Sequence, residues 1–376
     1  MSSSSPAWVR VPERYLDADV LVRERSVLAK NWTYFGLARD LGDHNDWVAQ
    51  SIGGTSVFVQ NVRGELLAFR NTCPHRFSAL RADRRGNGPM VCPYHQWSFD
   101  AAGLLKGCPT APELVHAPSS ERPSLEKWQV ARCGQFLFVA REPRVTLADW
   151  LGDAFGKLEA FSSNVGELLW SDQIVVDANW KILVQNTLEL EHVPSVHAES
   201  FAPLMPRPIK IAPIAEQTHV AYLAPLLPRP PVEGARAQQF VQVLEAAYAK
   251  RAIKNVDGYL HWLMFPNATF SCTQGRTIGL FRYEPIAVDQ TRVEMTCYQA
   301  RFDGLTPRER AAVSIDLQFD VQMTEILARE DAAQCKLVQQ GLRSLGTDAA
   351  PEMFSAGEWA VRAFRDAYLQ AMAGAE

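Results

Sequence analysis

The 376-residue sequence lacks the features that mark several classes of protein. No apolar stretch approaches the roughly 20 residues that a membrane-spanning helix needs. The first ten residues, MSSSSPAWVR, contain no basic segment followed by an apolar one, so they do not resemble a secretory signal. Lys and Arg number 38 against 42 for Asp and Glu, whereas nucleic-acid binders usually carry a basic excess. These absences predict a cytoplasmic protein without membrane or nucleic-acid partners.

Disulfide bonds and internal repeats are not expected either. Without export, the seven cysteines lie in a reducing compartment, where disulfides are rare. The serines at positions 2–5 form the one low-complexity segment. Hydrophobic residues make up 47% of the chain, which is sufficient for a substantial core, and the length favours two domains or three. The composition therefore predicts a globular enzyme of two domains.

The first half of the chain carries strand patterns. After a predicted helix at 20–32, short apolar runs such as SVFVQNV, ELLAFRN and FLFVAR fall between residues 46 and 140. Glycine pairs such as Gly53-Gly54 separate them, and this spacing predicts a small antiparallel β-domain.

The second half mixes helix and strand patterns. Residues 141–175 are predicted to be a connection with one helix at 147–161. An apolar helix is predicted at 180–190, and a long helix at 307–345. Between them lie the strand-like runs YLHWLMF, RTIGLFRYEPI and TRVEMTCYQARF. The second half is therefore predicted to be an α+β domain.

Two Cys-His pairs lie in the β-domain, within NTCPHR and VCPYHQW. Their spacing is Cys-x-His, sixteen residues, then Cys-x-x-His: Cys73, His75, Cys92 and His95. Two Cys and two His suit a tetrahedral structural zinc, but zinc knuckles usually space their ligands by about two to four residues. A [2Fe-2S] cluster with two Cys on one iron and two His on the other, the Rieske type of ligation, fits the short Cys-x-His spacing better.

Two further histidines lie in the segment QNTLELEHVPSVH. On a continuous helix Glu189 and His192, three residues apart, would share one face. Pro194 disfavours helix at the preceding residue, so the chain is predicted to bend there and bring His197 back toward His192.

A carboxylate in the long predicted helix is the third candidate ligand. Asp331 falls on a largely apolar stripe, where an unpaired carboxylate is costly unless it binds a metal. The apolar members of that stripe are Met323, Leu327, Val338 and Leu342. The adjacent Glu330 is an alternative carboxylate, and the helical pattern leaves the choice open. Two His and one carboxylate with open positions is typical of non-haem Fe(II) oxygenases.

The block CPHR…CPYHQWSFDAAGLL resembles the Rieske domain of ring-hydroxylating oxygenase α-subunits. The segment NWK…QNxxExxHxxxxH is similar to the catalytic motif of the same family. The cluster ligands that the resemblance implies are Cys73 and Cys92 on one iron and His75 and His95 on the other. The implied ligands of a mononuclear Fe(II) are His192, His197 and Asp331.

The resemblance also implies a fold and an assembly. The fold is α+β, with an N-terminal Rieske [2Fe-2S] antiparallel β-domain joined to a helix-grip (START/Bet v 1-like) catalytic domain. The expected boundaries are a lead-in at 1–38 that packs on the catalytic domain, the Rieske domain at 39–155 and the catalytic domain at 156–376. The implied assembly is a head-to-tail homotrimer, in which electrons pass from the cluster through His95 to Glu189 of a neighbouring subunit, and on to His192.

The sequence departs from the family pattern at three positions. Phe77 and Gln96 stand where such proteins usually have glycine after CPHR and CPYH. Glu189 stands where the family usually has Asp, a replacement that oxygenases acting on quaternary ammonium compounds such as carnitine can show.

The predicted function is that of a terminal oxygenase. It would use O2 and electrons from NAD(P)H, delivered by a separate flavin-containing reductase with or without a ferredoxin, since the chain has no G-x-G-x-x-G of its own at a strand-to-helix junction. Aromatic hydroxylation is the first expectation, by analogy with the family. The alternative is a monooxygenase or dealkylase acting on a quaternary ammonium or other amine or ether. The candidates for the pocket lining are Tyr259, Trp262, Met264 and Phe265.

A non-catalytic iron-sulfur electron carrier is the hypothesis from a different class. The second metal motif discriminates between them, because a carrier has no use for His192, His197 and Asp331.

Overall fold

The computed structural model describes residues 11–215, 218–346 and 352–374. The chain divides into two compact units. One consists of Arg25–Ser163, and the other combines Met1–Glu24 with Asn164–Glu376. We refer to them as the Rieske unit and the catalytic unit, after the motifs that each contains.

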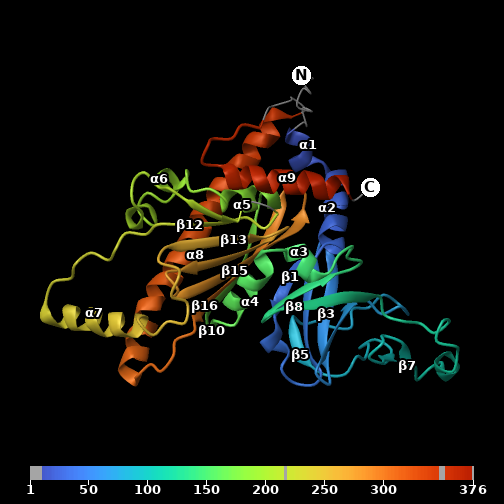
Figure 1. Ribbon diagram of the computed structural model, residues 1–376. Helices are drawn as coiled ribbons and strands as arrows, with labels where there is room; N and C mark the ends of the chain where they lie inside the picture. The colour runs from blue at the N-terminus through green and yellow to red at the C-terminus, as the bar shows by residue number, and fades with distance from the viewer. Residues whose placement is uncertain (1–10, 216–217, 347–351, 375–376) are drawn as a thin grey trace. The chain divides into compact units, whose positions relative to one another are not determined.

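The Rieske unit is an antiparallel β-structure (Figure 1). Its large sheet has the order β1-β9-β8-β4-β3-β2-β5, and β6 and β7 form a separate hairpin. The strands are β1 Thr33–Leu37, β2 Asp46–Ile52, β3 Thr55–Val62, β4 Glu65–Arg70, β5 Arg85–Asn87, β6 Ser98–Phe99, β7 Leu105–Gly107, β8 Lys127–Cys133 and β9 Phe136–Ala140. The helical segments are η1 Ala38–Leu41, η2 Pro112–Val115, α3 Leu147–Leu151 and α4 Ala154–Ser162.

Both faces of this sheet are covered by apolar side chains. On β3, Val57 and Val59 pack into one core, whereas Phe58 points into the other, because successive side chains of a strand alternate. The core around Phe58 also contains Cys73 and Cys92. The turns that carry the two Cys-His pairs are therefore anchored on the rigid sheet.

Glycines with positive φ explain two local features of the Rieske unit. Gly53 and Gly54 have φ of 56° and 78° and turn β2 into β3, as a tight hairpin requires. Gly152, with φ of 52°, ends α3, so the single helix predicted at 147–161 is divided into α3 and α4.

The unit boundaries differ from those expected from the sequence. They fall after Glu24 and after Ser163, whereas the sequence placed them after residues 38 and 155. Strand β1 explains the first difference, because Thr33–Leu37 pairs with β9 and so belongs to the Rieske sheet. Helix α4 explains the second, because it contacts β8. Residues 1–10 of the expected lead-in lie outside the described residues.

The catalytic unit is built on a second antiparallel sheet, of order β10-β16-β15-β14-β13-β12-β11. Its strands are β10 Val165–Val176, β11 Ala212–Ala215, β12 Ala221–Ala224, β13 Tyr259–Met264, β14 Ala268–Thr273, β15 Thr277–Ala287 and β16 Gln290–Ala300. Its helices are α1 Val11–Leu16, α5 Trp180–Asn186, α6 Val193–Val196, η3 Ala202–Leu204, α7 Ala235–Tyr248, α8 Pro307–Leu345 and α9 Trp359–Ala373. Helix α2, Ala18–Lys30, runs from this unit into the other.

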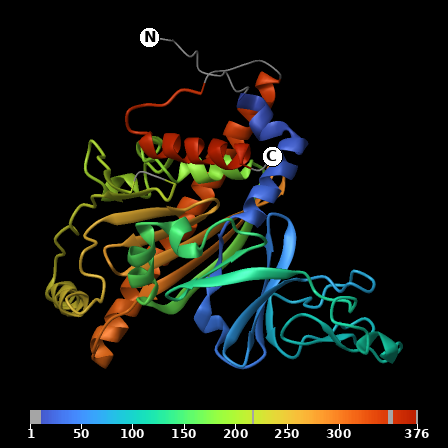
Figure 2. The same ribbon diagram turned by 45° about the vertical axis from the view of Figure 1, so that its right-hand side comes forward.

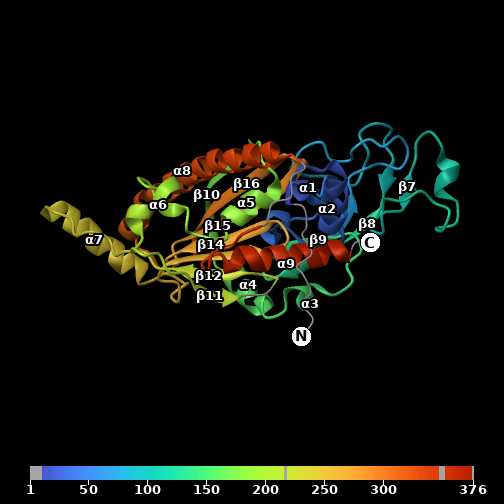
Figure 3. The same cartoon turned by 90° about the horizontal axis from the view of Figure 1, so that it is seen from above.

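Helix α8 dominates the catalytic unit and crosses one face of its sheet (Figures 1 and 2). Thr306 and Glu309 form a reciprocal capping box at its start, so the helix begins where the sequence predicts. Helix α5 contacts α8 on one side, and Trp180 of α5 packs on Phe364 of α9 on the other (Figure 3). None of the described helices is long and apolar enough to cross a membrane.

Two elements of the catalytic unit correct the sequence-based expectations. The 12-residue strand β10 lies in the segment predicted to be a connection. Its pairing with β16 along its length stabilises it, a long-range contact that no local pattern reports. Helix α5 ends at Asn186, not near Leu190, so Glu189 and His192 do not lie on it.

A buried ion pair connects three helices of the catalytic unit. Glu24 of α2 accepts hydrogen bonds from Lys181 Nζ, from Trp180 Nε1 at 2.9 Å and from Tyr368 OH at 2.6 Å. The side chains of Glu24 and Lys181 keep only 1% and 2% of their exposure. Burial lowers the pKa of Lys181, and the charge of Glu24 opposes that shift. The pair therefore attaches the middle of α2 to α5 and α9.

We expect Glu24→Gln to lower the free energy of unfolding of the catalytic unit by about 3–5 kcal/mol, because Lys181 would remain buried without its counter-charge. Adding Lys181→Met should recover most of that loss, since no buried charge then remains. Urea denaturation of the three proteins measures the difference. A double variant no more stable than Glu24→Gln would show that the hydrogen bonds to Trp180 and Tyr368, rather than the charge of Lys181, set the cost.

Candidate metal centres and substrate cavity

The two Cys-His turns of the Rieske unit have the same hydrogen-bond pattern. Cys73 N–H donates to Ser78 O at 2.8 Å, and Phe77 N–H donates to Cys73 O at 3.0 Å. In the other turn Cys92 N–H donates to Trp97 O at 2.8 Å, and Gln96 N–H donates to Cys92 O at 3.0 Å. The four predicted ligands therefore lie on two matched turns.

The departures from glycine fall on strained positions of these turns. Phe77 and Gln96 have φ of 61° and 58°, in the left-handed region that glycine adopts most readily. Each side chain there costs on the order of 1 kcal/mol. The matched hydrogen bonds show that both turns keep their shape nevertheless. Phe77 is also 78% exposed, so its ring adds no packing to offset that cost.

The Cys-His residues fit a two-iron cluster better than a single ion. The rings of His75 and His95 lie together, with centroids 4.6 Å apart, and Trp97 stacks on His75 at 4.5 Å. His75 Nδ1 is buried and has no hydrogen-bond partner within the described part of the chain. Burial raises the pKa of Cys73, while the backbone N–H groups of His75 and Arg76 that point at its sulfur lower it.

A tetrahedral zinc would hold its ligand atoms within about 3.8 Å of one another, given Zn–S and Zn–N bonds of roughly 2.3 and 2.0 Å. Among the described residues, the His, Cys, Asp and Glu side chains whose ligand atoms lie within 4.8 Å of one another are His192, His197 and Asp331, and not those of the Cys-His turns. The geometry therefore does not support the zinc alternative for the Cys-His site.

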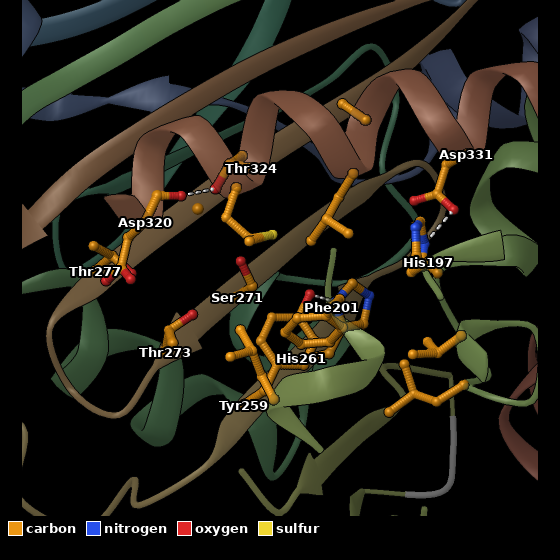
Figure 4. Close-up of a pocket in the computed structure, with 18 of the residues that line it drawn as sticks. His197, Phe201, Tyr259, His261, Ser271, Thr273, Thr277, Asp320, Thr324 and Asp331 are labelled. Atoms are coloured by element: carbon orange, nitrogen blue, oxygen red, sulfur yellow. Dashed lines mark hydrogen bonds and ion pairs between the residues drawn. The ribbon is translucent and has the colours of Figure 1, made fainter. Parts of the chain in front are cut away.

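The second metal site brings together the three residues that the sequence singled out. The rings of His192 and His197 have centroids 5.2 Å apart, because the chain turns at α6. Asp331 Oδ1 lies 3.5 Å from His192 Nε2 and 3.0 Å from His197 Nε2. This buried oxygen makes no hydrogen bond of acceptable geometry to any described residue. The ligand atoms of the three residues thus lie close enough together to hold one metal ion. Figure 4 shows two of these residues, His197 and Asp331, facing each other.

The turn between the histidines differs from the predicted one. Pro194 does not break a helix. It lies in the first turn of α6, a position where the missing N–H costs nothing. Glu189 is held by the same turn: its Oε1 contacts His192 Nδ1, and its Oε2 accepts from the backbone N–H of His192 at 3.2 Å.

Glu330 has a place that the sequence did not assign. Its Oε2 lies 2.7 Å from His197 Nδ1 and accepts from Ser200 Oγ at 2.6 Å. Asp331 therefore lies at the Nε2 atoms of the two histidines, whereas Glu330 lies behind one ring, and Asp331 stays the predicted ligand. Burial lowers the pKa of His197, but Asp331 and Glu330 outweigh it, so the pKa is raised overall. Glu330 resembles the carboxylates that orient metal-binding imidazoles.

A cavity of about 680 Å³ lies between α8 and the sheet, with the metal site in its wall. Alternate residues of the strands face it, among them Thr269, Ser271 and Thr273 of β14 and Thr277, Gly279 and Phe281 of β15. On α8 the facing residues recur every three or four positions: Asp316, Asp320, Met323, Leu327 and Asp331.

The same alternation corrects the predicted pocket lining. Tyr259 lines the cavity, together with His261, which the sequence did not single out. Trp262 and Met264 are displaced by an odd number of residues from Tyr259 and point to the opposite face. Phe265 packs on Phe364 of α9. If the alternation of side chains along β13 had been counted from His261, the sequence alone would have placed Tyr259 on the same face as His261, and Trp262 and Met264 on the opposite face.

Polar groups occur in the middle of the cavity and at its end. His261 contacts Tyr259 OH through Nδ1 at 3.2 Å, and burial lowers its pKa to about 3, so it is neutral near pH 7. At the end of the cavity Arg276 donates to Asp316 at 3.2 Å and to Asp320 at 3.3 Å. Burial raises the pKa of Asp320 to about 6.

Comparison with known families identifies both halves of the chain. The family model of the Rieske [2Fe-2S] domain matches residues 31–128. That of the ring hydroxylating alpha subunit (catalytic domain) matches residues 157–374, more than half of the chain. The chain belongs to the ring-hydroxylating α-subunit family. The membership, the fold class and the two iron cofactors that the resemblance implied are thereby confirmed.

Curated relatives include oxygenase subunits of known substrate. The carnitine monooxygenase oxygenase subunit of Acinetobacter pittii (strain PHEA-2) is 27% identical over 202 residues, 51% of this chain and 53% of the relative. The glycine betaine monooxygenase oxygenase subunit of Pseudomonas aeruginosa (strain UCBPP-PA14) is 26% identical over 207 residues, 54% of this chain and 47% of the relative. The chain thus spans about half the length of the curated relatives it matches.

Solved structures show the same fold over nearly the whole chain. The quaternary ammonium Rieske monooxygenase CntA in complex with L-carnitine has a TM-score of 0.73 at 19% identity, covering 96% of this chain and 94% of that one. Naphthalene 1,2-dioxygenase from Rhodococcus sp. bound to indole has a TM-score of 0.74 at 18% identity, covering 96% and 93%. At these identities the likeness establishes the fold.

Proposed function

We propose that the chain is a terminal oxygenase that uses O2 and electrons from NAD(P)H to insert oxygen into an organic substrate. One observation supports this most directly. A site of two His and one carboxylate opens onto a cavity of about 680 Å³, in a chain that also carries two matched Cys-His turns. An electron carrier would need the turns but neither the second site nor the cavity.

Each residue of the second site has a defined task in this proposal. His192, His197 and Asp331 bind Fe(II), which when bound supplies the site of O2 activation. Glu330 orients the ring of His197 and fixes which nitrogen faces the metal. The cavity keeps the substrate beside these ligands and excludes bulk water from them. Cys73, His75, Cys92 and His95 hold the cluster that stores the incoming electrons.

The assembly and the redox partner belong to the same proposal. A head-to-tail homotrimer would place His95 of one subunit next to Glu189 of its neighbour. Glu189 already contacts His192, and carboxylate oxygens have lone pairs for a further donor. The electrons would come through a flavin-containing reductase, with or without a ferredoxin.

For the substrate, the curated relatives favour the alternative over the first expectation. Relatives named for carnitine and glycine betaine support an amine-type substrate more than an aromatic hydrocarbon. The naphthalene dioxygenase structures share the fold alone. The replacement of Asp by Glu189 agrees with that preference.

The purified protein is expected to be brown, with a reduced-state EPR signal typical of mixed Cys/His ligation and three irons per chain. With a generic reductase and NAD(P)H, it should consume O2 in the presence of substrate. Two irons per chain after careful reconstitution, with no O2 uptake against a substrate panel, would favour the electron carrier. A colourless protein with one zinc would contradict both hypotheses.

A further inference from the structure

The cavity is long in one direction, and its two ends differ in chemistry. Asp320 and Asp331 lie on the same helix at opposite ends of the cavity (Figure 4). They are eleven positions apart on the α-helix, which corresponds to about 16 Å along its axis. Asp331 belongs to the metal site, whereas Asp320 has no part in it.

The middle of the cavity is lined by neutral side chains. Met323 and Leu327 face it from α8, and Phe281 and Met295 face it from the sheet. Its polar groups, on Tyr259, His261 and Ser271, are uncharged near pH 7 (Figure 4).

A bound molecule that filled the cavity would therefore have an uncharged, mostly apolar body. The carboxylate of Asp320 lies beyond the middle, where Thr273 and Thr277 also line the wall (Figure 4).

At the far end, one carboxylate oxygen has no hydrogen-bond partner among the described residues. Asp316 contacts Arg229, Arg276 and Tyr248. Asp320 shares only Arg276, through Oδ1, and its buried Oδ2 has no hydrogen-bond partner among the described residues. The Asp320 side chain keeps 11% of its exposure, and an acceptor so deeply buried is usually paired.

The charge at this end is negative within the buried region. The side chains of Asp316, Asp320 and Arg276 are 9–11% exposed, so two carboxylates face one guanidinium. Arg229 adds a second cation, but it is 47% exposed and screened by water. A cationic group on a ligand would complete the pairing of Asp320, whereas an anionic group would meet two carboxylates.

We propose, on the basis of the oxygenase function above, that the substrate is an elongated organic cation whose hydrogen-bond-donating head, a protonated amine or guanidinium, binds Asp320. Its apolar body spans the cavity, and the carbon to be oxidised lies beside His192, His197 and Asp331. After allowance for the contacts at both ends, about 10 Å remain between the head and the reacting carbon, or roughly eight bonds of an extended chain. Glycine betaine and carnitine are too short to reach both ends.

Binding tests the proposal without turnover. The reconstituted holoprotein is titrated anaerobically by calorimetry with n-decylamine, 1-decanol and decanoate, which share a body and differ in the head. The amine is expected to bind at least about tenfold more tightly than either of the others, a difference of about 1.4 kcal/mol. Asp320→Asn should abolish that preference and leave the Kd of the alcohol unchanged. Asp320→Glu should retain part of the preference.

Glu325→Gln is the matched control, because Glu325 lies on the same helix, pairs with Arg329 and does not line the cavity. It should bind all three ligands as the unmodified protein does. Equal affinity for the three heads, tighter binding of decanoate, or an amine preference that survives Asp320→Asn would overturn the proposal. So would tighter binding of glycine betaine or carnitine than of decylamine.

Product analysis separates this inference from the proposed function. With reductase, NAD(P)H and O2 supplied, oxidation of the amine near the end remote from its nitrogen is expected. Binding that depends on Asp320, but without any oxidation of bound amines, would support the binding site and count against the oxygenase. Oxidation next to the nitrogen would place the head at the iron and overturn the orientation proposed here.

Discussion

Asp331→Ala is expected to abolish product formation while the spectrum of the Rieske cluster stays unchanged. Asp331 Oδ1 lies within 3.5 Å of the Nε2 atoms of both His192 and His197, so alanine removes one of three converging ligand atoms. Loss of a residue that merely orients a ligand costs about 10–100-fold in metal affinity, and loss of the ligand itself should cost more. Mononuclear iron should therefore fall to a trace amount, so that only the two irons of the cluster remain in each chain.

Two other variants of α8 sharpen this experiment. Glu330→Gln should retain iron at reduced affinity, because Glu330 contacts only the Nδ1 side of His197. Glu325→Gln, on the exposed part of the same helix, should leave iron content and activity unaltered. Iron analysis, EPR and oxygen uptake on the same preparations give the comparison. Full iron and activity in Asp331→Ala, with loss of both in Glu330→Gln, would transfer the ligand role to Glu330.

Glu189→Gln is expected to leave both metal centres loaded and to slow electron transfer between them about tenfold or more. The carboxylate can accept a hydrogen bond from an N–H group of each of two imidazoles, whereas the amide of glutamine offers one acceptor and one donor. Its contact with His192 Nδ1 is one of these two hydrogen bonds. The other, from His95 of a neighbouring subunit, is part of the proposed assembly.

Stopped-flow oxidation of the reduced cluster, with substrate and O2 present, measures the effect. Glu189→Asp should recover part of the rate if the shorter side chain still reaches both imidazoles. Glu191→Gln is a suitable control, since Glu191 lies two residues from Glu189, is exposed and accepts a hydrogen bond from Ser355 Oγ. Cluster oxidation and product yield at the unmodified rate in Glu189→Gln would remove Glu189 from the electron path.

Most of the candidate site could be predicted from the spacing of residues. The Cys-x-His and Cys-x-x-His pairs, and the motif that ends at His197, are compact in sequence because each pair of candidate ligands comes from one turn. Helix α8 was predictable over its full length, since a capping box and a sustained period fix its start and its inward face. The predicted stripe was correct through Asp331 but not at Val338, which is 42% exposed, because the covered face of the helix continues through Cys335 and Gln339 instead.

Other features depend on residues that are distant in the sequence. Strand β10 is stabilised by its pairing with β16. Helix α5 ends at Asn186, and the turns that follow bring the rings of His192 and His197 together. Which of Glu330 and Asp331 faces the metal also follows from the rotation of α8 against the sheet. A local pattern can place both acids on the helix, but it cannot set that rotation.

The family and the two cofactors were predictable from the sequence, because the motifs that indicate them are short-range and chemically specific. The lining of the cavity was not predictable, because it depends on contacts between distant segments. The cavity lies where α8 packs against the sheet, and the alternation of side chains along β13 directs His261, rather than Trp262, toward it. Arg276 bonds only Oδ1 of Asp320, so Oδ2 has no hydrogen-bond partner among the described residues. These features arise from packing between distant segments, whose free energy depends on the whole core and not on any local run of residues.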